Sequence, residues 1–420
     1  MSTIKRIVAV LCIFAFTTIA WMILGATIFQ RTYGQDETLK SRVSSTWGTS
    51  QAQSPATASY QQLSKTLQEV YEHGRTMNKW VETTQQVDLS PLSTNVDVGL
   101  QLSHRQKGLL WYSTYKVLFA GEYTFQNTSK QDQQVTFNFP FPAEQAIYDD
   151  VVLTVDGVPT GFKNEKNAAH AVALVGAGKV SLLKVSYASQ GMDSWRYQFS
   201  TEIAQVRDFH LKMTANFKDI DFPDNTLSPS SKQETADGWR LDWNYKNLVS
   251  GYQIGMTMPE KLQPGPLAGR ISLFAPVSLF FFFFLVFIIT TIRGNDLHPM
   301  NYFFLAAAFF AFHLLMAYLV DHISIHYSFV IASLVSLGLV ISYMRLVAGP
   351  RFALLECGAA QFVYLVLFSY AFFFKGFTGL AVTIGSIITL FAVMQMTGRI
   401  NWAEKFVGSP KNPVRGNASS

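Results

Sequence analysis

The chain has 420 residues and a net charge of +5, but only 15% of its residues are charged, against roughly 25% in a soluble globular protein. It contains 35 phenylalanines, and its apolar residues are concentrated near the N-terminus and after Arg270, so the composition indicates a membrane protein. Lysine and arginine gather at the ends of apolar segments and form no basic run with interleaved aromatic residues, so we expect no nucleic-acid partner.

The first apolar segment covers residues 7–29 and follows Lys5 and Arg6. A cleaved signal peptide and an uncleaved anchor are the two alternatives. The run of about 22 residues is long enough to span a bilayer of about 30 Å. Its last residues, Gly25 to Phe29, make a poor cleavage site. We therefore expect a transmembrane anchor over residues 1–29.

A long polar insertion follows the anchor. Residues 35–56 are rich in Ser, Thr and Gln, which is typical of a loose linker. Over residues 60–81, apolar residues recur every three or four positions, which predicts a helix. Residues 30–95 are therefore expected to form a linker and a helix.

From Val96 onward the apolar period changes to two, which indicates strands. Asp156-Gly157 and Asp237-Gly238 are turn signals. The pattern predicts a mainly antiparallel, β-sandwich-like domain over residues 96–270, because many short alternating strands are separated by turns. The predicted strands cover residues 96–102, 123–126, 135–139, 152–155, 180–187, 195–199, 210–217, 239–243 and 252–258.

Five further apolar segments follow, which gives a membrane α-helical bundle of six helices in all. They predict a transmembrane block over residues 271–398 and a tail over residues 399–420. Basic residues flank these segments on the side that the N-terminus shares, so the positive-inside rule places both termini in the cytoplasm and residues 30–270 in the periplasm of a bacterial cell. The five segments cover residues 271–292, 302–320, 327–343, 352–374 and 380–396.

Four short motifs lie in the C-terminal third. Leu-His-Pro-Met-Asn-Tyr occupies residues 297–302, Asp-His follows at 321–322, Ile-Ala-Ser-Leu occupies 331–334, and Thr-Gly-Arg-Ile-Asn-Trp occupies 397–402. Their order and spacing resemble the CreD family of inner-membrane proteins over residues 270–406. The resemblance implies a part in cell-envelope integrity and, in some bacteria, in an envelope-stress regulon. No enzymatic reaction or transported substrate is established for that family.

The first candidate functional residues are His298 and Pro299, where a membrane helix begins. Proline is tolerated in the first turn of a helix because its missing N–H would have no partner there. The structural interpretation is therefore a helix start with an interfacial histidine. The functional alternative is a histidine that senses protons or a partner.

Three more candidates are His313, Asp321 and His322. We interpret His313, about halfway along the third apolar segment, as a packing residue with a hydrogen bond, because no acidic residue lies at a similar depth. We interpret Asp321 and His322 as a polar helix end with a local ion pair. The alternative is a proton relay or a metal site that includes His326, although no third ligand is evident nearby.

Two functions remain in view. The first is a non-enzymatic inner-membrane protein whose periplasmic β-domain binds a periplasmic protein or another envelope component. The second is a transporter or channel through the C-terminal helices, with His313, Asp321 and His322 as its polar path. The sequence has no His-Glu-x-x-His motif and no phosphate-binding loop, and no cofactor is expected. Membrane lipids are expected partners.

Overall fold

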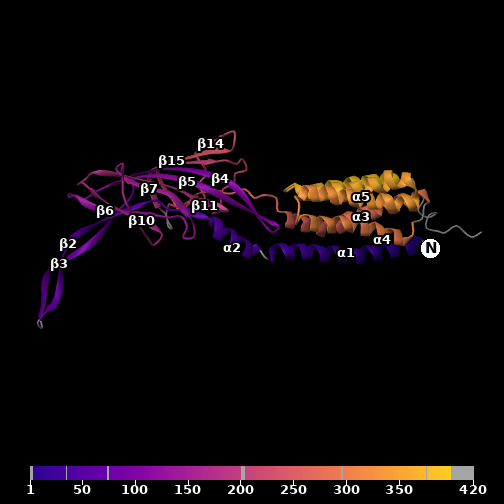
Figure 1. The fold of residues 1–420 in the computed structure, drawn as a ribbon, viewed down its shortest axis with the longest axis horizontal. Coiled ribbons are helices and arrows are strands. Elements are labelled where there is room, and N and C mark those ends of the chain that lie inside the picture. Colours follow the sequence, from indigo (N-terminus) through magenta and orange to yellow (C-terminus); the bar gives the residue numbers. More distant parts are fainter. Residues whose placement is uncertain are drawn as a thin grey trace, which may run out of the picture. The chain divides into compact units, whose positions relative to one another are not determined.

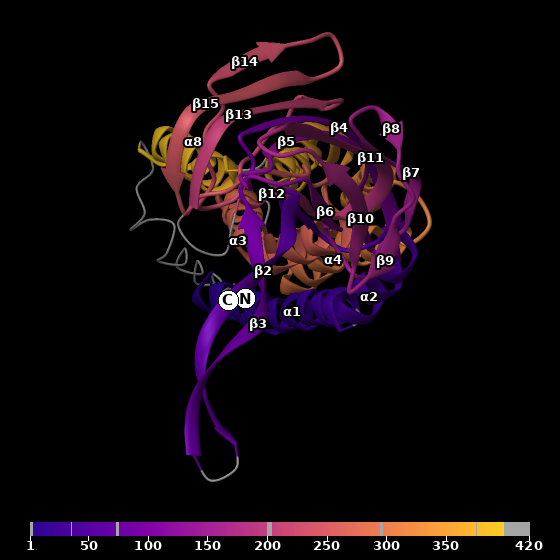
Figure 2. The same cartoon turned by 90° about the vertical axis from the view of Figure 1, so that its left-hand side faces the viewer.

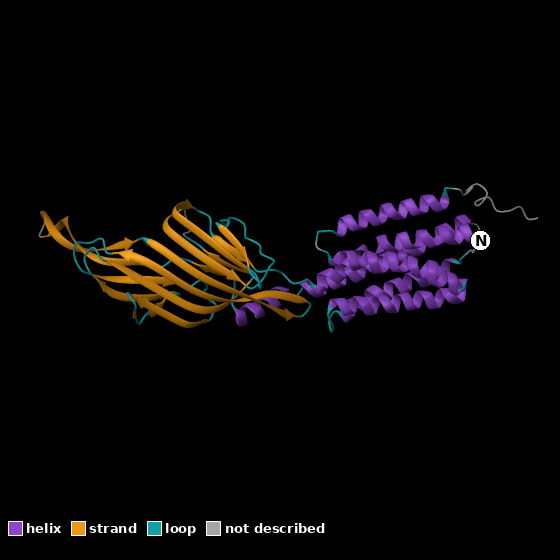
Figure 3. Cartoon of the chain, turned by 90° about the horizontal axis from the view of Figure 1, so that it is seen from above, coloured by secondary structure: helices purple, strands orange, loops and turns teal. Residues whose placement is uncertain are grey.

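The chain divides into two compact units, which are described separately. The β unit comprises Thr38–Lys107 and Trp111–Lys261, and the helical unit comprises Met1–Glu37, Gly108–Leu110 and Leu262–Ser420. Six helices in the described part of the chain are long and apolar enough to cross a membrane (Figures 1 and 3). The predicted fold class is thus confirmed. The computed structural model describes residues 3–34, 36–72, 75–199, 204–294, 297–374 and 376–398.

The helical unit contains one N-terminal helix and five C-terminal spans, all at the predicted places. The helix α3 begins at Pro264 rather than at residue 271, because two prolines in its first turn cost no backbone hydrogen bond. The span from Phe352 is α-helical only in part and contains two π-helical stretches. The spans are α1 (Thr3–Tyr33), α3 (Pro264–Arg293), α4 (Pro299–Leu319), α5 (Ile325–Ala348), the composite η1, α6, η2, α7 and η3 (Phe352–Phe373), and α8 (Thr378–Thr397).

Aromatic rings fill the interior of the helical unit. Within the phenylalanine run of α3, Phe282 packs on Phe309 with ring centroids 5.5 Å apart, and both rings are buried. Phe280 and Phe284, on the opposite side of the same run, are 46% and 37% exposed. This division is expected of a membrane helix, which packs one face on its neighbours and turns the other to the lipid.

The β unit consists of three sheets. Their strand orders are β14-β15-β13-β4-β5-β11-β7-β8, β3-β2-β6-β10-β9 and β1-β12-β16. Parallel pairing joins β4 to β13 and β1 to β12, and the other pairs described are antiparallel. The strands are β1 (Gln51–Gln53), β2 (Thr57–Glu72), β3 (Arg75–Leu89), β4 (Ser93–Lys107), β5 (Leu110–Gln126), β6 (Gln133–Pro140), β7 (Tyr148–Val155), β8 (Val158–Pro159), β9 (Lys163–Glu165), β10 (Ala168–Val175), β11 (Val180–Met192), β12 (Ser194–Tyr197), β13 (Ala204–Ala215), β14 (Ser231–Glu234), β15 (Trp239–Ser250) and β16 (Ile254–Thr257).

All nine strands predicted from Val96 onward are present, and so are both predicted turns. Asp156 and Gly157 have φ angles of +52° and +80°, and they join β7 to β8. Two residues with positive φ make the tight hairpin turn whose twist suits the flanking strands. The Asp156 carboxylate also accepts hydrogen bonds from the hydroxyl of Ser181 and the backbone N–H of Leu182.

The core of the β unit lies where the eight-stranded sheet faces the five-stranded one. Phe125 of β5 packs on Phe137 of β6 with ring centroids 5.7 Å apart, and Phe119 of β5 packs on Phe139 of β6 at 5.8 Å. All four side chains are buried. The alternating aromatic residues that predicted these strands are thus the ones that join the two sheets.

The helix predicted over residues 60–81 is wrong. β2 and β3 form an antiparallel hairpin there, paired from Ala58 with Leu89 to Glu72 with Arg75 (Figure 2). β2 pairs with β6 through Thr57–Tyr60 only, and beyond Tyr60 it pairs with β3 alone in the described part of the chain. We call Gln61–Glu72 together with Arg75–Gln86 the arm. The described side chains of the arm lie outside the β core, so they lack the period of two that a core on one side imposes.

The loose linker predicted over residues 35–56 is also wrong. Asp36–Trp47 form the helix α2, and β1 follows it. The Arg105 guanidinium lies 4.0 Å from the Trp47 ring centroid, and Lys40 Nζ lies 2.8 Å from Asp193 Oδ2. The polar composition misled the prediction because glutamine can be buried when it is fully hydrogen-bonded.

Gln53 shows how β1 is held. Its Nε2 donates to the carbonyl of Pro140 at 2.9 Å, and its Oε1 accepts from the hydroxyl of Tyr187 at 2.8 Å. The residue is fully buried. A segment that resembles a linker by composition is therefore part of the polar interior of the β unit.

Candidate functional site

His298 and Pro299 start the helix α4. The backbone of His298 is extended, its Nδ1 accepts a 3.3 Å hydrogen bond from the backbone N–H of Met300, and Pro299 is the first helical residue. These are the features of an N-cap, in which a side chain satisfies an N–H that the helix leaves free. The structural interpretation of this pair therefore agrees with its geometry, and sensing by His298 stays an untested alternative.

His313 lies in the middle of α4 and is 1% exposed. Its Nδ1 donates to the carbonyl of Phe309 at 3.1 Å, one turn back in the same helix. Rings enclose it, because Trp21 of α1 and Phe312 lie with ring centroids 5.8 Å and 4.8 Å away. The site is a packed aromatic contact between α1 and α4.

Asp321 lies just past the end of α4 and does not form the local ion pair predicted with His322. Its two carboxylate oxygens accept hydrogen bonds of 2.8 and 2.6 Å from Nη2 of Arg31, at the end of α1. His322 is exposed in the same turn. No group of three or more metal-ligating side chains occurs among the residues that the structure describes.

The five predicted residues do not form one site. They lie at the start, in the middle and after the end of one helix, and α4 has 21 residues, or about 30 Å at 1.5 Å per residue. The sequence also missed the residues that contact them, Arg31 and Trp21. No local signal could identify these two, because they belong to a helix about 290 residues earlier in the chain.

Polar contacts between helices also occur at the end of the helical unit that contains the start of α1. Arg6 of α1 donates to the hydroxyl of Thr291 of α3 at 3.0 Å, and Tyr343 of α5 donates to Asn301 of α4 at 2.8 Å. Arg293 of α3 pairs with Glu356 of the composite span. These contacts join residues near the start of one helix to residues near the end of another, as antiparallel neighbours require.

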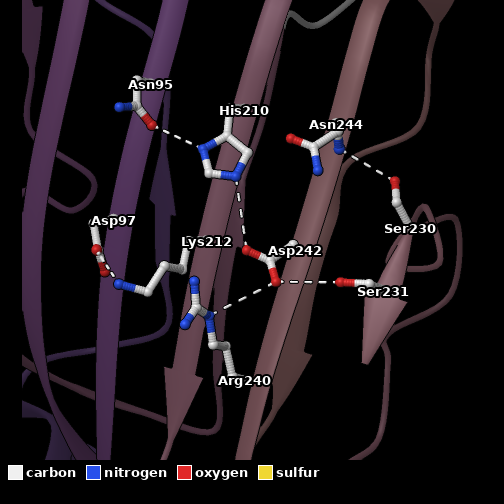
Figure 4. Close-up of polar contacts among 9 residues, drawn as sticks. All are labelled: Asn95, Asp97, His210, Lys212, Ser230, Ser231, Arg240, Asp242 and Asn244. Carbon is white, nitrogen blue, oxygen red and sulfur yellow. Dashed lines mark hydrogen bonds and ion pairs between the residues drawn. The ribbon is translucent and has the colours of Figure 1, made fainter. Parts of the chain in front are cut away.

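In the β unit, the solvent face of the large sheet carries a row of polar side chains across β4, β13, β15 and β14 (Figure 4). Lys212 Nζ lies 2.7 Å from Asp97 Oδ2, and His210 Nδ1 lies 2.9 Å from Asn95 Oδ1. Asp242 receives a 3.2 Å hydrogen bond from the hydroxyl of Ser231.

The charges of this row are paired with one another. His210 Nε2 and Arg240 Nε lie 3.7 and 3.8 Å from the carboxylate of Asp242. Opposite charges on neighbouring strands stabilise a sheet by cross-strand pairing. The row is therefore a solvated, internally neutral face rather than a catalytic constellation.

The arm presents large apolar side chains to the solvent. Leu63 is 73% exposed and Trp80 is 65% exposed. Between them, Lys65 Nζ lies 3.1 Å from Glu82 Oε1. In the pairing of β2 with β3, Lys65 lies opposite Glu82 and Leu63 lies opposite Thr84. Since residues two apart on a strand share a face, Leu63, Lys65, Glu82 and Trp80 lie on one face of the arm.

Several tyrosines lie in the interior of the β unit. Burial raises the pKa of Tyr123 and of Tyr197 above the ordinary value. Burial also raises the pKa of Tyr148 to about 12, although its hydroxyl donates to the carbonyl of Ala143 at 2.7 Å. The raised pKa values keep these phenols protonated at neutral pH, so they are not nucleophiles there.

Solved structures offer only distant similarity. One is a candidate nutrient binding protein from Legionella pneumophila, at 12% identity and a TM-score of 0.31, covering 46% of this chain and 73% of that one. Another is an M1 zinc metallopeptidase from Deinococcus radiodurans, at 6% identity and a TM-score of 0.24, covering 40% and 42%. A third is leukotriene A4 hydrolase from Saccharomyces cerevisiae, at 10% identity and a TM-score of 0.20, covering 40% and 29%. TM-scores this low support no conclusion about function.

Among curated proteins, none matches this sequence. The family model described as inner membrane protein CreD matches residues 2–403. That range covers the whole β unit and nearly all of the helical unit, and the six apolar helices agree with a protein that crosses the membrane several times. The chain belongs to the CreD family of inner membrane proteins.

Proposed function

We propose that this protein contributes to cell-envelope integrity or to the envelope stress response, without catalysis, by binding an envelope component through its β unit. The observation that carries the proposal is the arm. A two-stranded ribbon is at best marginally stable alone in water, and exposed tryptophan and leucine on one face are typical of a contact surface. The contact residues are Leu63 and Trp80, with the ion pair of Lys65 and Glu82 between them.

The proposed orientation places the β unit in the periplasm and both termini in the cytoplasm. Six spans are an even number, so they return the chain to its starting side. Lys5 and Arg6 lie in the first turn of α1, and Arg293 and Arg351 lie at the ends of later spans on that same side. This distribution supports a cytoplasmic location for that side, because basic loop residues are retained there.

The orientation is tested with single cysteines in a Cys12→Ser, Cys357→Ala background. Lys130→Cys lies in an exposed loop of the β unit, and Arg351→Cys lies at the exposed start of the span from Phe352. In spheroplasts, a membrane-impermeant maleimide should label Cys at position 130 at once and Cys at position 351 only after permeabilisation. The reverse pattern would overturn the orientation.

The contact is tested in intact cells with a photocrosslinking amino acid at position 80. The control position is Val158, which is 64% exposed in the same unit. We expect position 80 to give discrete crosslinked species with an envelope protein or glycan, and position 158 to give none. Equal crosslinking at both positions would show that the arm has no special contact.

The physiological role is tested by complementation. A deletion strain should be more sensitive to detergents and antibiotics under conditions that induce the protein. Leu63→Ser with Trp80→Ala should fail to restore tolerance, whereas Val158→Ala with Leu174→Ser, also on exposed residues of the β unit, should restore it. Normal sensitivity of the deletion strain would refute the envelope role, and full rescue by the arm variant would refute the part assigned to the arm.

A further inference from the structure

A cleft of about 250 Å³ lies between the first half of α1 and the second half of α3. All eight residues that line it are apolar. Five of them are phenylalanines, one from α1 and four from α3. Leu11, Phe280 and Phe284 of this lining are 54%, 46% and 37% exposed, so the cleft opens to the outside of the helical unit. The lining residues are Ile7, Val10, Leu11, Phe14, Phe280, Phe283, Phe284 and Phe287.

A positive charge lies at one end of this cleft. Arg6 is 5% exposed, and its Cζ lies 4.8 Å from the ring centroid of Phe287, which also lines the cleft. Its Nη2 donates to the hydroxyl of Thr291 at 3.0 Å, which fixes the guanidinium beside the cleft. Lys5 is the neighbouring residue and is exposed.

The positions along α1 fit the depth profile of one membrane leaflet. Arg6 is in the first turn of the helix, where a side chain reaches the level of the lipid headgroups. The lining residues from Ile7 to Phe14 extend about 10 Å further along the helix axis, into the hydrocarbon. The cleft is therefore an apolar groove that begins beside a cation, Arg6, at the level of the lipid headgroups and extends into the hydrocarbon.

We propose that this cleft binds one anionic phospholipid from the leaflet on the N-terminal side, with an acyl chain against the phenylalanines and the phosphate at Arg6 and Lys5. An acyl chain matches the lining, because close packing requires that apolar space in the hydrocarbon be filled by apolar material. The anionic headgroup follows from charge complementarity, since basic pockets between membrane helices attract anionic lipids. This site is independent of the proposed contact at the arm.

Native mass spectrometry of the full chain in mixed micelles tests the site. The probes are phosphatidylglycerol and phosphatidylethanolamine with identical acyl chains. The protein should retain phosphatidylglycerol about five-fold more than phosphatidylethanolamine, which corresponds to the attraction of roughly one basic residue near a membrane surface. Equal retention of the two lipids would overturn the proposal.

Variants separate the headgroup contact from the acyl contact. Arg6→Gln should bring the ratio of the two lipids close to one, and Arg6→Lys should keep most of the preference. The matched control is Arg31→Gln at the opposite end of α1, which should leave the ratio unchanged. A ratio that responds equally to Arg6→Gln and Arg31→Gln would refute a site at Arg6.

The acyl contact is tested by filling the cleft. Leu11→Trp adds bulk at an exposed lining position, so it should lower the retention of both lipids several-fold without disturbing the buried helix contacts. This variant keeps the test decisive if Arg6→Gln unfolds the protein. Unchanged lipid retention in Leu11→Trp would place the lipid elsewhere.

Discussion

Arg31 and Asp321 connect two helices whose sequences lie 290 residues apart. One guanidinium nitrogen of Arg31 donates to both carboxylate oxygens of Asp321, at 2.8 and 2.6 Å. The side chains are 34% and 29% exposed, and the guanidinium also lies 5.4 Å from the ring centroid of Tyr318. The contact holds the end of α1 against the end of α4, so Asp321 has a structural partner and is not a free acid for a proton path.

The first prediction concerns the coupling between these two residues. Arg31→Gln and Asp321→Asn should each lower the melting temperature of the detergent-solubilised protein. The double variant should be little worse than either single one, with a coupling of about 1 kcal/mol for a half-exposed pair. The double-mutant cycle gives this value directly. Additive effects of the two substitutions would show that the pair contributes nothing.

The second prediction concerns the arm, whose described side chains all lie outside the β core. Tyr60 is buried in that core and Val87 packs against it, while Leu63 and Trp80 are exposed. Replacing residues 62–85 by Asn-Gly would connect Gln61 to its partner Gln86 through a two-residue turn.

This shortened protein should keep its β-sheet circular dichroism and unfold within about 1 kcal/mol of the complete chain, because the described side chains that it loses lie outside the β core. Phe137→Ala is the contrasting variant, since it removes a fully buried ring and should cost about 3–5 kcal/mol. A shortened protein as unstable as Phe137→Ala would mean that the arm is needed for folding.

The arm also shows what the sequence could and could not predict. Strands were predictable from Val96 onward because a core on one side forces every second residue to be apolar, as in Val96, Val98 and Leu100. Tyr60, just before the arm, lies in that core, but none of the described side chains of the arm does. The spacing of its apolar residues therefore matches a helix by chance, and long-range pairing decides the structure instead.

Among the candidate residues too, local features were predictable from the sequence and long-range contacts were not. The N-cap at His298 and Pro299 was predictable because capping depends on neighbouring residues. The partner of Asp321 was not, because it comes from a helix at the other end of the chain. The membrane helices themselves were predictable, since each one satisfies its backbone hydrogen bonds internally and must be apolar along its whole length.

The third prediction is a loss of stability at alkaline pH. The pKa of Tyr148 is about 12 in the folded protein and about 10 in an unfolded chain. Between these values the unfolded state has released the proton and the folded state retains it, so the free energy of unfolding falls as the pH rises from about 10 to 12. Below pH 10 the contribution of this residue is constant.

Denaturant unfolding of the full chain between pH 9 and pH 12 measures this decrease. Tyr148→Phe should be less stable at pH 9, because the backbone N–H and carbonyl of Ala143 lose their partner. Its stability should also fall less steeply above pH 10 than that of the unsubstituted chain. Lysines titrate in the same range, so the difference between the two proteins isolates Tyr148, and parallel pH profiles would contradict the assignment.

The last prediction addresses a polar path through the helices. A transporter that uses His313 needs water at that side chain, but His313 is enclosed by Trp21, Phe309 and Phe312 and is 1% exposed. In a Cys12→Ser, Cys357→Ala background, His313→Cys should resist a membrane-impermeant maleimide from both sides of the membrane and react only after unfolding. His322→Cys, in an exposed turn, should react from one side. A conducting path must admit water even when it opens only briefly, so labelling should be followed for hours. Slow modification of His313→Cys in the folded protein would restore the transport hypothesis.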